Sequence, residues 1–203
     1  MKIIGCSVFR AEAEHVLGEA ARQIEWISPG LHVNLGRMER ALDERLGPDG
    51  ALCLLAGCHP DLDRMLRERG GRRLPGKDCV AVFIDEAERK RLEGRRAFVM
   101  TPGWLDHWRE IFREALGWDD VDARQNFGLY DTIVLLDFGL APIDDMALLE
   151  FFEFVQVPIE VVPASLDRFR EAVRGLLALP PAEAAGPPAD EPGAPPQPAP
   201  PER

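Results

Sequence analysis

Residues 51–63 read Ala51-Leu52-Cys53-Leu54-Leu55-Ala56-Gly57-Cys58-His59-Pro60-Asp61-Leu62-Asp63, an apolar run followed by a turn and a helix-start signal. The run is short enough for a buried strand, and Gly57 permits a tight turn. Pro60 suits the first turn of a helix, and the aspartates after it favour the amino end of that helix electrostatically. This stretch therefore predicts a strand, a turn and a helix, with Cys58 and His59 at the turn.

The same order of strand pattern and helix pattern recurs along the chain. The expected strands cover residues 2–5, 24–28, 51–56, 96–100, 132–136 and 159–162. Helical patterns follow them, and the strongest apolar stripe predicts one helix over residues 101–116. Repeated strand–helix units imply right-handed crossovers. The predicted fold class is α/β, a doubly wound and mainly parallel sheet with helices on both faces.

Composition separates one folded domain from a tail. Residues 1–179 are enough for one α/β domain, whereas the proline- and alanine-rich residues 180–203 are expected to be disordered. The net charge of -11 argues against a nucleic-acid binder. The chain opens on a strand pattern rather than a leader, and no apolar run approaches the roughly 18 residues of a membrane span. We therefore expect a cytoplasmic protein.

Four cysteines in a cytoplasmic protein indicate metal binding, catalysis or simple burial rather than disulfides. Cys53 lies among leucines inside a strand and is expected to act as a small hydrophobic residue. Cys6 ends the first strand, and Cys58 follows the third. The segment around Cys79 is ambiguous: we favour a helix capped by Asp78, with Cys79 in its first turn, over a strand that begins at Cys79.

The carboxyl ends of parallel strands meet at one edge of a sheet, which can bring distant thiols together. Cys6, Cys58 and Cys79 are therefore predicted to form a soft-metal site. With an open iron position they suit a 4Fe-4S iron–sulfur cluster, our first choice of cofactor. With His32 or His59 as a fourth ligand they suit zinc, the alternative.

A second candidate site lies at Thr101-Pro102-Gly103-Trp104. Thr101 can cap a helix and Pro102 suits its first position, so Thr101, Gly103 and Trp104 are predicted to bind an anion or substrate together with Asp137. An enzymatic alternative makes Cys58 the nucleophile of a small-molecule transferase or hydrolase, with His32 or His59 as base.

A third interpretation is a partner-binding scaffold. It would use the basic run from Arg64 to Lys77 and the tail, and it leaves the cysteines inert. These alternatives leave open whether the protein is an enzyme.

Several of these positions resemble a prokaryotic family, the domain of unknown function 1638. The resemblance spans roughly residues 1 to 179 and is carried above all by Thr101-Pro102-Gly103-Trp104-Leu105. The weaker features are Cys6, Leu31-His32, the turn around Cys58, Asp78-Cys79, Tyr130 and Asp137 to Gly139. It implies that Cys6, Cys58 and Cys79 act as a set, without supplying a reaction. Members look like neighbours of corrinoid-dependent methyl-transfer and metalloenzyme systems, so the expected partner is a metalloenzyme or corrinoid-system protein.

The leading hypothesis is therefore a metal-binding accessory protein. It would transfer electrons, or mature and deliver a metallocentre, in connection with one-carbon metabolism.

Overall fold

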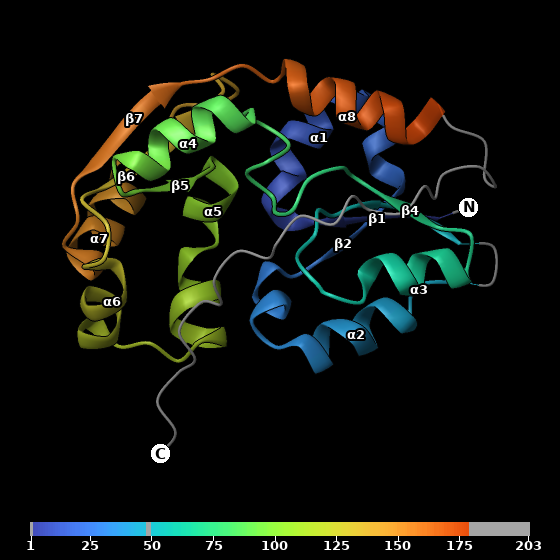
Figure 1. Ribbon diagram of the computed structural model, residues 1–203, viewed down its shortest axis with the longest axis horizontal. Helices are drawn as coiled ribbons and strands as arrows, with labels where there is room; N and C mark the ends of the chain where they lie inside the picture. The colour runs from blue at the N-terminus through green and yellow to red at the C-terminus, as the bar shows by residue number, and fades with distance from the viewer. Residues whose placement is uncertain (1, 48–49, 179–203) are drawn as a thin grey trace.

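The computed structural model describes residues 2–47 and 50–178 (Figure 1). The predicted tail, 180–203, lies outside the described residues, as does Leu179 at the end of the last predicted helix. The strands are β1 (Lys2–Cys6), β2 (Ile24–Ile27), β3 (Ala51–Leu54), β4 (Arg72–Arg73), β5 (Ala97–Met100), β6 (Thr132–Asp137) and β7 (Ile159–Pro163). The helices are α1 (Arg10–Leu17), α2 (Leu35–Asp43), α3 (Leu62–Glu68), α4 (Glu86–Gly94), α5 (Pro102–Asp106), α6 (Asp120–Phe127), α7 (Asp145–Val155) and α8 (Asp167–Ala178).

The strands form two parallel sheets with helices on both sides. The first has the order β2-β1-β3-β4 and the second the order β5-β6-β7, and every neighbouring pair is parallel. The predicted α/β class and parallel pairing are confirmed. The structure divides the strands between two sheets, and the segment that connects β4 to β5 consists of turns and helix α4, which lies over the second sheet (Figure 1).

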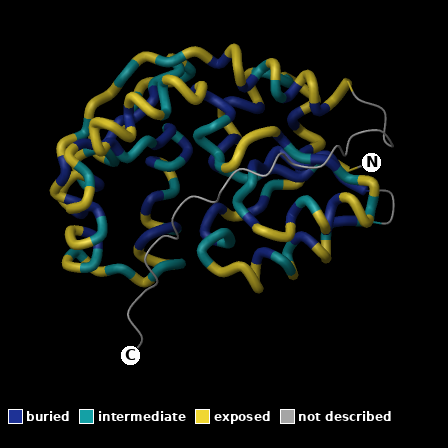
Figure 2. The backbone as a smooth tube through the Cα atoms, in the orientation of Figure 1, coloured by how far each residue is buried: buried dark blue, intermediate teal, exposed yellow. Residues whose placement is uncertain are grey.

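Strand β3, one of the two inner strands of the first sheet, is buried on both faces, as its continuous apolar run predicts (Figure 2). Leu52 and Leu54 face a cluster that contains side chains of α1 and α8. Ala51 and Cys53 face the opposite cluster, which α2 and α3 cover. Cys53 is fully buried, which confirms its expected role as a small hydrophobic residue.

One hydrophobic cluster contains side chains from both sheets. Val134 of β6 belongs to it together with Leu52 of β3 and Phe9, which follows β1. Helix α8 leaves the second sheet and returns beside α1 (Figure 1), where Phe169 and Val173 join the same cluster. The other face of β6 packs on a second, aromatic-rich cluster from α5, α6 and α7.

The predicted helix over residues 101–116 is interrupted. Helix α5 ends at Asp106, and Arg109–Ala115 winds as a wider π-helix. The sequence pattern also failed to predict α6, although Asp119 and Asp122 form a reciprocal capping box at its start. Across residues 2–47 and 50–178, no helix combines the length and apolar character needed to cross a membrane.

The carboxyl ends of the two sheets pack against each other. An ideal Cβ on Gly103, after β5, would lie 2.1 Å from the carbonyl oxygen of Val8, after β1. A Cβ on Gly30, after β2, would lie 3.1 Å from Cβ of Ala115. These close approaches bring segments that follow strands of both sheets to one place, where the predicted cysteines also lie.

Candidate metal centre

Three of the four cysteines converge at this edge; we call Cys6, Cys58 and Cys79 the three-thiol cluster. All three are free and partly buried. Burial raises the pKa of the Cys6 thiol, and negative charge on Cys58 and Cys79 would raise it further. Burial likewise raises the pKa of Cys79 to about 12, with a smaller contribution from Cys58. Cys6, at the end of β1, therefore lies within electrostatic range of Cys58 and Cys79, which come from two separate loops.

Cys58 is held by the contact between two loops. The amide of Gly57 donates to the carbonyl of Gly76 at 3.1 Å. A Cβ on Gly57 would lie only 2.8 Å from the carbonyl oxygen of Lys77, so the loops can approach this closely only because residue 57 is glycine. The Cys58 Sγ in turn points back to the Ala56 carbonyl, at 3.5 Å.

Cys79 lies in a turn, so both the favoured helix and the alternative strand are wrong. Asp78 does cap this turn, since its Oδ1 accepts from the amides of Val80 and Ala81 at 3.0 and 2.9 Å. Helix α4 starts only at Glu86, after Asp85 has capped it. A second partner of Asp78, Arg89 of α4, donates to the same oxygen at 2.7 Å and holds the turn against the helix.

The Thr101–Leu105 segment supplies the neighbour of Cys79. Trp104 Nε1 donates to the Cys79 Sγ at 3.2 Å, a contact that favours the charged form of the sulfur. Pro102 occupies the first turn of α5, as predicted. Thr101 makes no capping bond, and its buried Oγ1 has no partner among the described residues. The predicted cap is therefore wrong at Thr101, whereas the proline position is confirmed.

The two predicted histidines lie before and after Cys58 in the chain and have different surroundings. The His32 ring centroid is 5.6 Å from that of Trp104, and its Nδ1 contacts the Pro29 carbonyl. Burial lowers the pKa of His32, which favours the neutral ring that metals bind. His59 is buried, and its Nδ1 accepts from the Asp61 amide at 3.1 Å, which leaves Nε2 as the nitrogen available to a ligand.

The sequence pattern gave no sign of Glu110 at this site. Its carboxylate adds negative charge that raises the pKa of Cys6. Ser28 donates to one Glu110 oxygen, and His107 Nδ1 lies 2.9 Å from the other. Glu110 lies in the π-helical segment Arg109–Ala115, which follows β5 of the second sheet. The sequence around Cys6 therefore could not predict that Glu110 lies near it.

The cluster is not a preassembled coordination shell. Across residues 2–47 and 50–178, no group of three His, Cys, Asp or Glu side chains has metal-ligand spacing. The three thiols are close enough to influence one another, so ligation would require the loops that carry Cys58 and Cys79 to draw inward. Thiolates are soft ligands, and the donor set suits iron or zinc.

Carboxylates line a cavity that borders the predicted anion site. Asp137 ends β6, and its Oδ1 accepts from the Gly139 amide at 2.8 Å. The small cavity next to it is lined by Asp137 together with Glu12, Asp106 and Asp144. Anion binding by Thr101, Gly103 and Trp104 stays a prediction, and the nearby charge favours a cation.

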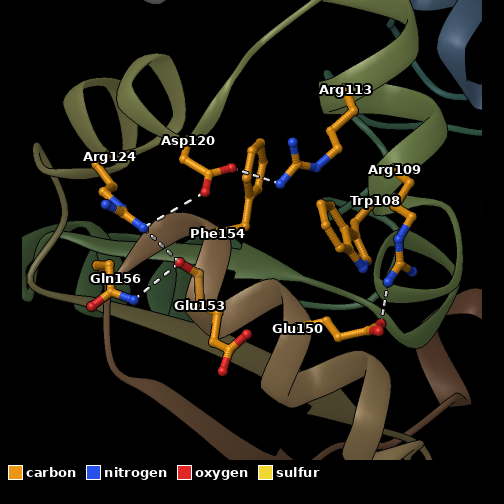
Figure 3. Close-up of a pocket in the computed structure, with 9 residues that line it drawn as sticks. All are labelled: Trp108, Arg109, Arg113, Asp120, Arg124, Glu150, Glu153, Phe154 and Gln156. Atoms are coloured by element: carbon orange, nitrogen blue, oxygen red, sulfur yellow. Dashed lines mark hydrogen bonds and ion pairs between the residues drawn. The ribbon is translucent and has the colours of Figure 1, made fainter.

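A larger hollow, about 510 Å³, lies away from the cysteines between the π-helical segment, α6 and α7 (Figure 3). Several of its charged side chains pair with one another: Arg113 donates to Asp120 at 2.6 Å, and Arg109 donates to Glu150. Arg124 contacts the Glu153 carbonyl at 3.2 Å. Because both Arg109 and Arg113 are already paired, the pocket offers weaker support for a ligand than the three-thiol cluster.

The raised thiol pKa values predict slow alkylation. At pH 7.5, iodoacetamide should label Cys6 and Cys79 at least about 100-fold more slowly in the native protein than in the denatured chain, and Cys58 also more slowly, because burial raises each thiol pKa and little thiolate is present. Mass spectrometry of labelled peptides over a pH series measures this, and the rates should keep rising to pH 10. Rapid labelling of Cys58 alone at neutral pH would contradict the prediction and support a nucleophile.

Comparison with known proteins gives one match. A family model described as "Protein of unknown function (DUF1638)" matches residues 26–173. The matched range includes Cys58, Cys79, both candidate histidines and the Thr101–Trp104 segment, whereas Cys6 precedes it. No curated protein and no solved structure matches the chain.

Proposed function

Because the chain belongs to the DUF1638 family, whose description assigns no reaction, we propose a function from its own residues: it binds a soft metal centre through Cys6, Cys58 and Cys79. The observation that carries the proposal is that Cys6, at the end of β1, packs against both hydrophobic clusters that Cys79 and Cys58 also contact, although the three residues are far apart in sequence. If all three thiols lost their protons, the thiolates would repel one another, and a bound cation would remove that repulsion.

The surroundings suit a metal centre held away from bulk water. Trp104 donates to the Cys79 sulfur, which is the kind of hydrogen bond that tunes sulfur ligands. His32 lies against the same indole, and His59 directly follows Cys58. Either ring is a candidate fourth ligand. A 4Fe-4S cluster is the first choice, since three thiolates leave one iron open, and zinc with one histidine is the second.

A buried centre of this kind suits an accessory role, either electron transfer or the maturation and delivery of a metallocentre to a partner enzyme. A corrinoid-dependent system of one-carbon metabolism is the partner that the family resemblance suggests. The cysteine-nucleophile alternative is less well supported, because burial keeps the Cys58 thiol protonated by raising its pKa.

The scaffold alternative is also less well supported. Its basic run is largely neutralised within the chain: Arg73 pairs with Asp63 at 2.6 Å, and Arg69 pairs with Asp43 at 2.9 Å. A surface whose charges are already paired attracts an acidic partner less strongly.

Anaerobic reconstitution with ferrous iron and sulfide tests the proposal. After desalting, the wild-type chain should retain about four iron atoms and show broad visible absorption. Cys6→Ala, Cys58→Ala and Cys79→Ala should each lose most of the iron. Cys53→Ala is the matched control, because Cys53 is a fully buried thiol within β3 that the proposal does not make a ligand, and this variant should retain iron.

Zinc titration separates the two metals. If the site binds zinc, the protein should bind one equivalent, and either His32→Ala or His59→Ala should weaken zinc binding at least about 10-fold. Circular dichroism of each variant verifies folding. If the wild-type chain retains neither metal, or if Cys53→Ala loses as much as the others, the proposal is wrong.

A further inference from the structure

Glu12 on α1 is a buried carboxylate without a partner. Its side chain is 1% exposed, and neither oxygen has a hydrogen-bond partner on another described residue. Burial raises the pKa of Glu12 to about 7, its own backbone amide lowers it, and Asp106 raises it further. An unpaired buried carboxylate is costly, so its presence calls for a positively charged partner.

Glu12 lines a cavity of about 120 Å³ between α1, α5 and the loop that follows β6. Asp106, Asp137 and Asp144 line the same cavity, and no Lys, Arg or His of the described chain does. The rest of the wall is apolar. Its larger side chains are Leu105, Phe138, Leu140 and Ile143.

Two of the other carboxylates already have structural roles. Asp137 accepts from the Gly139 amide, and Asp144 caps α7 by accepting from the Met146 amide at 2.9 Å. Asp106 lacks such a bond among those found in the described chain; burial raises its pKa, His107 lowers it, and Asp144 raises it. Glu12 and Asp106 are therefore the carboxylates available to a ligand.

We propose that this cavity binds a small organic cation, an ammonium group carrying a short alkyl chain, with Glu12 as its counter-ion. A cation would form an ion pair with the unpartnered Glu12 carboxylate. The apolar wall accommodates an alkyl chain better than a hydrated ion. A divalent metal is disfavoured, since the described carboxylates are not spaced as a metal-binding group of three. At about 30 Å³ per water-sized group, the cavity holds roughly four such groups, about the size of a short alkylammonium ion.

The inference does not depend on the proposed metal centre. Pro102 and Leu105 line the cavity, whereas Trp104 between them contacts Cys79. The two sites thus share the α5 segment but have no residue in common. Loss of iron in the cysteine variants would leave cation binding intact.

Calorimetric titration with n-butylammonium chloride at pH 8 tests the proposal in the wild-type chain. Butylammonium should bind, whereas n-butanol, which has a similar shape without charge, should bind at least about 10-fold more weakly. The affinity for butylammonium should fall between pH 8 and pH 6, because Glu12 takes up a proton in this range. The other titratable groups that face the ligand are Asp106, Asp137 and Asp144. Mg²⁺ and K⁺ provide the inorganic comparison.

Variants connect binding to the cavity. Glu12→Gln keeps the volume and removes the charge, so butylammonium affinity should fall at least about 10-fold; Asp106→Asn should cause a smaller loss. Glu14→Gln, at an exposed position on the same helix, should bind as the wild type does. The proposal is overturned if Glu12→Gln binds normally, if butanol binds equally well, or if only Mg²⁺ binds.

Discussion

Gly103→Ala is expected to lower the free energy of unfolding by about 3 kcal/mol or more. The added Cβ would lie 2.1 Å from the Val8 carbonyl oxygen and 2.7 Å from its carbon. Both are backbone atoms, which cannot move aside as a flexible side chain can. Since Val8 follows Cys6 closely and Gly103 precedes Trp104, relief of this clash must also displace residues of the three-thiol cluster.

Gly175→Ala is the matched control. Gly175 lies within α8, and nothing stands within 4 Å of its ideal Cβ. Alanine there should stabilise the helix by about 0.5–1 kcal/mol. Urea denaturation followed by circular dichroism measures both variants. If Gly103→Ala costs less than about 1 kcal/mol, the two sheet edges do not pack as described.

Phe9→Ala is expected to cost about 3–5 kcal/mol in a single unfolding transition. Phe9 is 1% exposed, and its ring centroid lies 5.9 Å from that of Phe83 and 5.6 Å from that of Phe169. The same cluster contains Val134 from the second sheet. Removal of the ring should therefore destabilise both sheets together, as expected of one cooperative domain.

Phe152→Ala makes the same chemical change at a position of α7 that is 39% exposed, and it should cost less than about 1 kcal/mol. Circular dichroism and tryptophan fluorescence should give coincident unfolding curves for Phe9→Ala. Two separated transitions would show instead that the sheets unfold independently, as two domains.

Features confined to a few neighbouring residues were predictable. The apolar run before Gly57 gave a strand with Cys58 beyond its end, and Pro102 started a helix. The turn around Cys79 was not predictable, because its apolar residues suit a strand and the charged residues after it suit a helix. Asp78 capped a turn there instead, and helix formation began only after Asp85.

The site itself shows the same division. Strand ends can be read from the chain, so Cys6 and Cys58 were expected at one edge. The contacts of Trp104 with Cys79 and His32, and the charge of Glu110 that raises the pKa of Cys6, join elements of different sheets. Nothing in either segment alone indicates which distant segment it meets.

The sequence by itself determined the parallel α/β class and the place of two cysteines at strand ends, because alternation, turns and helix starts act over short stretches. The tertiary structure alone decided that the strands divide into two sheets, whose edges enclose three thiols. The tertiary structure also decided that the Glu12 carboxylate is buried without a hydrogen-bond partner among the described residues. Burial depends on which surfaces meet, and long-range packing sets that.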